Sequence, residues 1–205
     1  TQVADEIEFK KLSIPGTGGS FSYNYEADTE GNFRSQHTYM DIPAQWKAGI
    51  RAFEIISDRQ RGASTALTGK NVTCNKESVG ITVGAAVDLI NTQLNNNPDE
   101  CVVLIFTYQP TGGFSWGRNA STYASNLAAW YKSLSYKNKF ILYTPDLTMG
   151  NVRGKILTIV RVNQRDEDSD SFDGAVKALA ECPFLVVNGC GTAKDKWGAR
   201  GYTIT

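Results

Sequence analysis

The sequence holds a single histidine, His37, among 205 residues, and this scarcity restricts the available chemistry more than any other feature. A catalytic pair of histidines is excluded. A zinc site of the usual spacing is also excluded, because the four cysteines form no Cys-x-x-Cys motif. We expect free or buried thiols, with one or two disulfides in an oxidising compartment as the alternative, at Cys74, Cys101, Cys182 and Cys190.

Neither sign of charge is in excess, since 21 Lys and Arg residues balance 21 Asp and Glu residues. Domains that bind the nucleic-acid backbone usually carry a basic excess, so a nucleic-acid partner is not expected. No apolar run approaches the roughly 18 residues that a membrane-spanning helix needs. With 41% hydrophobic and 20% charged residues, the composition is that of a globular protein with its own core.

Short apolar runs alternate with helical patterns along the chain. Extended segments are predicted at Phe9–Ile14, Ile50–Ile56, Val102–Thr107, Phe140–Tyr143, Ile156–Val162, Phe184–Val187 and Gly201–Thr205. Amphipathic or capped helices are predicted at 42–48, 83–96, 123–134 and 172–179. This alternation predicts an α/β fold with parallel strands, and because no linker composition interrupts it, residues 1–205 are expected to form one domain.

Four motifs occur in a fixed order: Ile14-Pro-Gly-Thr-x-x-Ser20, the helix-to-strand segment 42–55, the helix–strand segment 81–105, and Val152–Leu157. Together they resemble the phosphatidylinositol-specific phospholipase C family in its bacterial X-domain form. The resemblance covers roughly residues 9–162. It implies a distorted TIM-type (β/α)8 barrel with its site at the carboxyl ends of the strands. Such a barrel usually takes about 250 residues, so it is expected to be incomplete in this chain.

The family's reaction transfers the phosphodiester to the inositol 2-hydroxyl, using two histidines as base and acid and a cation beside the phosphate. That cation is an arginine in bacterial forms and calcium in eukaryotic forms. The resemblance therefore implies a phosphoric diester hydrolase that meets a phosphorylated head group at a peripheral membrane surface. It also implies a secreted or cell-surface location.

The residues at the expected catalytic positions depart from this pattern. Gly18 stands where the first histidine belongs, and the second is expected near Thr73 or Cys74. Ile56 replaces the phosphate-facing arginine, and His37 lies on a long loop where one imidazole cannot serve as both base and acid. Family catalysis is therefore expected to be impaired.

Glu54 is the candidate catalytic carboxylate, and it also matches a calcium-ligand position of the eukaryotic form. Arg161 matches an arginine of the family that contacts substrate. The candidate substrate-binding residues are Arg161, Gly18, Gly19, Ser20, Tyr108 and Trp116. As alternatives, the glycines serve only to form a tight turn and the aromatic rings only pack loops.

Three functions follow from these residues. The first is a barrel that has lost family catalysis and retains a cleft for a phosphorylated inositol, lipid or sugar head group. The second is an active phosphodiesterase with a rearranged site, assisted by a metal such as Ca²⁺ through Glu54. The third is a structural or glycan-binding surface domain that uses only the scaffold.

Overall fold

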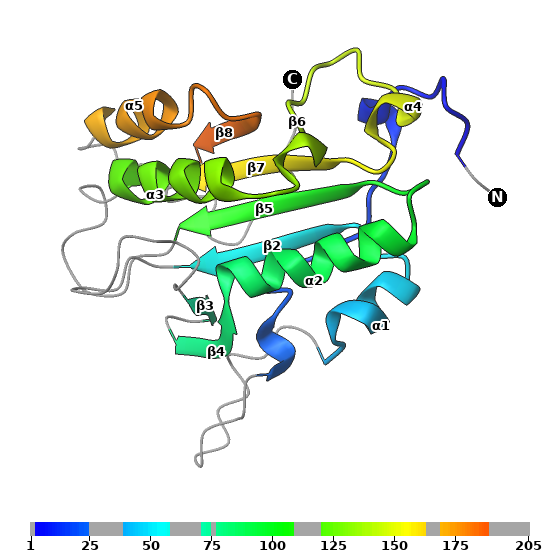
Figure 1. Ribbon diagram of the computed structural model, residues 1–205, viewed down its shortest axis with the longest axis horizontal. Coiled ribbons are helices and arrows are strands. Elements are labelled where there is room, and N and C mark those ends of the chain that lie inside the picture. The colour runs from blue at the N-terminus through cyan, green and yellow to red at the C-terminus, as the bar shows by residue number, and fades with distance from the viewer. Residues whose placement is uncertain are drawn as a thin grey trace, which may run out of the picture.

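The computed structural model describes residues 3–24, 39–57, 71–74, 77–108, 120–162 and 169–188. A curved, mainly parallel sheet carries its longer helices on one face, as Figure 1 shows. The strands are β1 (Gly16–Thr17), β2 (Ala52–Ser57), β3 (Asn71–Cys74), β4 (Glu77–Thr82), β5 (Val102–Tyr108), β6 (Phe140–Ile141), β7 (Ile156–Val162) and β8 (Phe184–Asn188). The helices are α1 (Ile42–Lys47), α2 (Val83–Asn96), α3 (Ala120–Ser133), α4 (Met149–Val152) and α5 (Ser169–Ala178), with 3-10 turns at Phe9–Lys11, Ser22–Asn24 and Lys137–Lys139.

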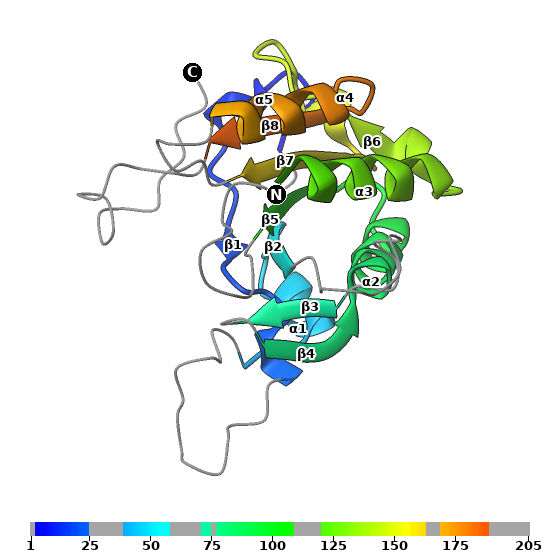
Figure 2. The ribbon, with the colours of Figure 1, turned by 90° about the vertical axis from the view of Figure 1, so that its left-hand side faces the viewer.

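Five strands, β1, β2, β5, β7 and β8, lie side by side and pair in parallel. The short β6 pairs with the first residues of β7, and β8 pairs with the remaining residues of β7. Both therefore lie along the edge of β7 opposite β5. β3 and β4 form an antiparallel hairpin that continues from the end of β2. Within the described residues the sheet does not close into a barrel (Figure 2). The predicted parallel β/α architecture, distorted and incomplete, is confirmed.

Helix boundaries follow the capping residues seen in the sequence. Asp41 accepts a hydrogen bond from the backbone N–H of Ala44 at the start of α1, and Gly49 just beyond its end has a positive φ of 91°. Thr82 accepts from the N–H of Ala85 at the start of α2. The positions that define the apolar stripe of α2, Val83, Val87, Ile90 and Leu94, are all buried. Both predicted helices are confirmed.

Strand alternation divides the sheet into two faces. The helix face carries Phe53, Leu104, Phe106 and Val160, which form one buried cluster with apolar residues of α2 and α3. The opposite face, called the inner face below, carries Ala52, Glu54 and Ile56 of β2 and their neighbours on β5 and β7. Burying a large apolar side chain stabilises a fold by about 1.5–3 kcal/mol, so the cluster on the helix face, the larger of the two buried clusters in the described residues, contributes more stabilisation by burial than the inner face does.

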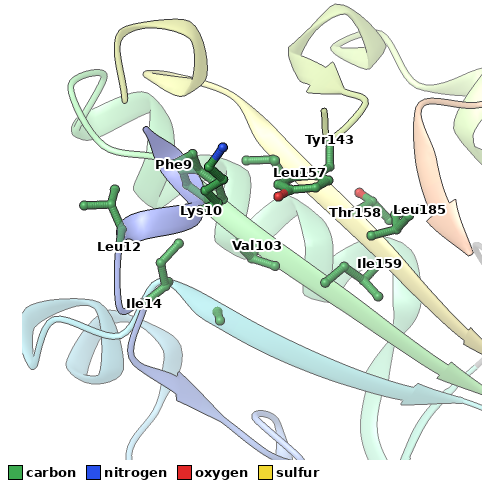
Figure 3. A pocket seen from close by; sticks show the side chains of 11 residues that line it. Phe9, Lys10, Leu12, Ile14, Val103, Tyr143, Leu157, Thr158, Ile159 and Leu185 are labelled. Carbon is green, nitrogen blue, oxygen red and sulfur yellow. The ribbon is translucent and has the colours of Figure 1, made fainter. Parts of the chain in front are cut away.

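The inner face is apolar at the amino-terminal half of the strands. A cavity of about 420 Å³ lies there (Figure 3). Its strand side is formed by Val103, Leu157, Ile159 and Leu185, and the segment that precedes β1 adds Phe9, Leu12 and Ile14. The polar residues described below lie nearer the carboxyl ends of the same strands, so the inner face changes from apolar to polar along the strand direction.

The amino-terminal segment is fastened to α4, which follows it by about 140 residues in sequence. The backbone carbonyls of Asp5 and Ile7 accept hydrogen bonds from the N–H groups of Gly150 and Met149. Arg153 adds an ion pair with Asp5 at 2.6 Å. The segment therefore covers the amino-terminal end of the inner face.

Several local predictions were wrong. Phe9–Lys11 forms a 3-10 turn instead of a strand, because Glu8 pairs with both Lys10 and Lys11 and Phe9 bonds to the carbonyl of Leu147. In this part of the described chain, the residues that pair with β2 are Gly16 and Thr17, just beyond the predicted strand. The β3–β4 hairpin was not predicted, and β6 is shorter than Phe140–Tyr143. The extended piece predicted at 201–205 lies outside the described residues.

Two of the four cysteines, Cys101 and Cys182, are buried free thiols, as predicted. Burial is the main reason that the pKa of the Cys101 thiol rises to about 11, which keeps it protonated and unreactive at neutral pH. The Cys74 side chain and Cys190 lie outside the described part of the structure.

β1 approaches β2 so closely that Gly16 leaves no room for a side chain. A Cβ atom at this position would lie 2.9 Å from the Ala52 Cβ and 3.2 Å from the Ala52 carbonyl oxygen. Gly16→Val should therefore lower the free energy of unfolding by about 1–3 kcal/mol, measured by urea denaturation. Ser13→Val, at a nearby exposed position, should change it by less than about 0.5 kcal/mol. Equal effects of the two substitutions would contradict the close approach.

Candidate functional site

Glu54 lies in the middle of β2 and points to the inner face, where its carboxylate joins neighbouring segments. Oε1 accepts a hydrogen bond from the Thr107 hydroxyl on β5 at 2.7 Å. Oε2 accepts from the backbone N–H of Gly19 at 3.0 Å. The side chain is only 14% exposed, so these donors replace most of the water that would otherwise solvate its charge.

Arg161 reaches the same carboxylate from β7. It is the register partner of Thr107 on β5, and its Nη1 lies 3.7 Å from Glu54 Oε1. The structure thus brings together the two candidate residues that the sequence placed on separate strands. Arg161 keeps 26% of its side chain exposed, so this side chain is partly accessible to solvent.

The turn that follows β1 is held against β2 by Ser20. Its backbone N–H donates to the Glu54 carbonyl at 3.2 Å, and its Oγ accepts from the Glu54 N–H at 2.8 Å. Gly19 has a positive φ of 56°, a conformation that favours glycine. Ser20 and Gly19 are buried beneath the turn, whereas Gly18 is exposed. The turn therefore presents Gly18, where the family places a histidine, to solvent.

Two residues of this network were not identified from the sequence. Gln45 on α1 is 1% exposed, and its side-chain amide donates to the carbonyls of Ser20 and Met40 while accepting from the Thr17 hydroxyl. Thr107 binds Glu54 directly. The available signal was polarity: Thr107 interrupts the apolar run of β5, and Gln45 stands beside Trp46 on the buried side of α1.

One of the two aromatic candidates, Tyr108, is not brought to this site. Tyr108 ends β5 on the helix face, is 1% exposed, and packs against Tyr123 with ring centroids 5.0 Å apart. Burial raises the pKa of Tyr123, whose hydroxyl accepts a hydrogen bond from Ser57. Tyr108 therefore packs in the core instead of facing Glu54, and the sequence-based assignment to substrate binding is not supported. Trp116 and His37 lie outside the described residues.

A calcium ion does not fit the surroundings of Glu54. Calcium takes six to eight oxygen ligands. Here both carboxylate oxygens already accept hydrogen bonds, and the cationic Arg161 lies 3.7 Å away. Across the ranges that the structure describes, no group of three or more His, Cys, Asp or Glu side chains could hold a metal ion.

The polar cluster of Glu54, Thr107, Arg161 and Ser20 is suited to recognition more than to proton transfer. A guanidinium can donate several parallel hydrogen bonds to phosphate or hydroxyl oxygens. Glu54 is largely buried, hydrogen-bonded to Gly19 and Thr107 and paired with Arg161, so its carboxylate holds these groups together. No helix among the described residues is both long and apolar enough to cross a bilayer.

No protein-family model and no curated protein matches the sequence. Solved structures do match the fold. A mutant of phosphatidylinositol-specific phospholipase C from Staphylococcus aureus gives a TM-score of 0.62 at 18% identity, over 78% of this chain and 51% of that one. A structure from a study of membrane binding by the S. aureus enzyme gives 0.63 at 19% identity, with the same coverage. The Listeria monocytogenes enzyme gives 0.58 at 20% identity, over 87% of this chain and 70% of that one.

The chain thus has a phospholipase C-like fold of the distorted TIM-barrel type, and the resemblance seen in the sequence is confirmed at the level of fold. It spans about half the length of the S. aureus structures that it matches. Identities of 18–20% establish the shared fold alone.

Proposed function

We propose that this protein is a phospholipase C-like domain that binds a phosphorylated head group and has largely lost phosphodiester cleavage. The observation that carries the proposal is the meeting of Arg161, Glu54 and the 18–20 turn on the inner face of the sheet. In (β/α) barrels, sites form at the carboxyl ends of the strands, and this cluster lies toward those ends.

The chemistry of the cluster supports a phosphorylated polyol as the ligand class. Arg161 offers planar donors for phosphate oxygens, while the exposed Gly18 leaves room beside the turn where a side chain would otherwise stand. The solved structures of similar fold are of enzymes named for phosphatidylinositol. An inositol phosphate, free or as the head group of a lipid, is therefore the first ligand to test.

The loss of cleavage follows from the side chains present. Gly18 supplies no imidazole, and Glu54, which bonds to the Gly19 N–H and the Thr107 hydroxyl, is a single carboxylate where the reaction needs both a base and an acid. A metal-assisted reaction through Glu54 is disfavoured by the same two bonds and by the adjacent Arg161. Contact with a membrane surface, and a secreted or cell-surface location, stay predictions that cell fractionation would check.

The proposal is tested by binding. Isothermal titration calorimetry with inositol 1-phosphate should detect saturable binding, and Arg161→Gln should weaken it at least about 10-fold, because charge-assisted bonds to phosphate are lost. Lys177→Gln removes the same charge from an exposed position on α5 and should leave affinity unchanged.

Equal losses in Arg161→Gln and Lys177→Gln would show a non-specific charge effect and would reject the site. If the folded, unmodified protein shows no binding, the proposed function is wrong. A structural or glycan-binding role of the scaffold would then be favoured.

A further inference from the structure

We infer that Glu54 is the counter-ion of Arg161 and the anchor of the 18–20 turn. The head-group site then binds phosphate without calcium, and the negative charge of Glu54 lowers its affinity for phosphate. This inference rests on the proposed function and assigns a role within the same site. It replaces the catalytic and calcium-binding roles expected for Glu54 from the sequence.

The first step concerns the contacts of the Glu54 carboxylate. Both oxygens accept hydrogen bonds from the protein, one from the turn and one from β5, and Arg161 Nη1 lies 3.7 Å from Oε1. The backbone of Glu54 is bound as well, since its N–H donates to Ser20 Oγ and its carbonyl accepts from the Ser20 N–H. Glu54 is therefore built into the scaffold beneath the turn.

The second step is exposure. The Glu54 side chain is 14% exposed and that of Arg161 is 26% exposed, so a ligand arriving from solvent meets the guanidinium more readily than the carboxylate. A phosphate group that contacts Arg161 must then share the guanidinium with Glu54. The phosphate and the Glu54 carboxylate would both carry negative charge beside this guanidinium.

The third step is whether Glu54 raises or lowers the affinity for phosphate. In a partly buried site, two anions a few ångströms apart repel each other appreciably, because water screens them less than it does at an open surface. Neutralising Glu54 should thus strengthen the electrostatic attraction between Arg161 and phosphate. A ligand role for Glu54, through calcium or through a direct contact, predicts the opposite sign.

The experiment measures affinity for inorganic phosphate and for inositol 1-phosphate by isothermal titration calorimetry, in EDTA and in millimolar CaCl₂. Glu54→Gln, which keeps the size of the side chain and one acceptor oxygen, should raise phosphate affinity about 3- to 10-fold. The matched control is Glu6→Gln, which removes the same charge at an exposed position and should change affinity less than 2-fold. The unmodified protein should bind equally well in EDTA and in calcium.

The outcomes separate this inference from the proposed function. If the unmodified protein binds but Glu54→Gln binds more weakly, or within 2-fold of it, the inference is overturned and the proposed function stands. Calcium that tightens binding to the unmodified protein more than 3-fold would also overturn the inference, and this arm holds even if Glu54→Gln does not fold. If neither probe binds the folded, unmodified protein, both are overturned.

Discussion

The unmodified protein is expected to release inositol phosphate from phosphatidylinositol vesicles at least about 10⁴-fold more slowly than the S. aureus phospholipase C assayed beside it. Loss of one general acid or base typically reduces the rate by 10²–10⁴. Here Gly18 replaces the first histidine that the family pattern requires, and Ile56 replaces its phosphate-facing arginine. Glu54 is largely buried and paired with Arg161, and one carboxylate supplies only one of the two proton-transfer groups that the reaction needs.

Two further measurements make this expectation specific. Gly18→His should restore little activity, because a single imidazole supplies either the base or the acid while the arginine at position 56 is still missing. Calcium should not increase turnover. Rapid cleavage in EDTA would contradict the expectation and require another base in the protein, and calcium-dependent cleavage that Glu54→Gln abolishes would favour the metal-assisted phosphodiesterase instead.

Phe106→Ala is expected to be the most destabilising of the substitutions considered, lowering the free energy of unfolding by about 3–5 kcal/mol. Phe106 is 0% exposed on the helix face of β5, and its ring forms a T-shaped pair with Trp130 on α3 at a centroid distance of 5.6 Å. Removal of the ring leaves a cavity that the sheet and α3 cannot close. Urea denaturation followed by circular dichroism would measure the change.

Phe106→Leu is the control for this prediction. It keeps most of the apolar volume and should cost clearly less than Phe106→Ala. If the alanine variant lost less than about 1 kcal/mol, the packing of β5 against α3 described here would be incorrect.

The long elements were predictable because one physical signal dominated each of them. α2 combines a capping residue, Thr82, with an uninterrupted apolar stripe, and β5 and β7 are continuous apolar runs buried on the helix face. The hairpin of β3 and β4 has the composition Asn-Val-Thr-Cys and Glu-Ser-Val-Gly-Ile-Thr, which is too polar to signal strands. Its pairing depends on the neighbouring end of β2, which local sequence does not reveal.

The candidate site was predictable in its charged members and less so in the rest. Glu54 and Arg161 could be named because the resemblance assigns roles to their positions, and they prove to be ion-pair partners.

The face on which Tyr108 lies depends on counting along β5 from a known register, which the sequence does not fix. Thr107 could be placed on the inner face only once β5 was paired with β7.

The attachment of the amino-terminal segment to α4 determines when this segment can fold during translation. Arg153 binds Asp5 and the carbonyl of Val3, contacts that span 148 and 150 residues of sequence. On the ribosome, residues 3–9 emerge before their partners on α4, which are synthesised only after β5 and α3. The Ile7 carbonyl and the Phe9 side chain therefore lack their native partners on α4 while β1 to α3 are being made, and the two ends of this long loop can be joined only after α4 has been synthesised.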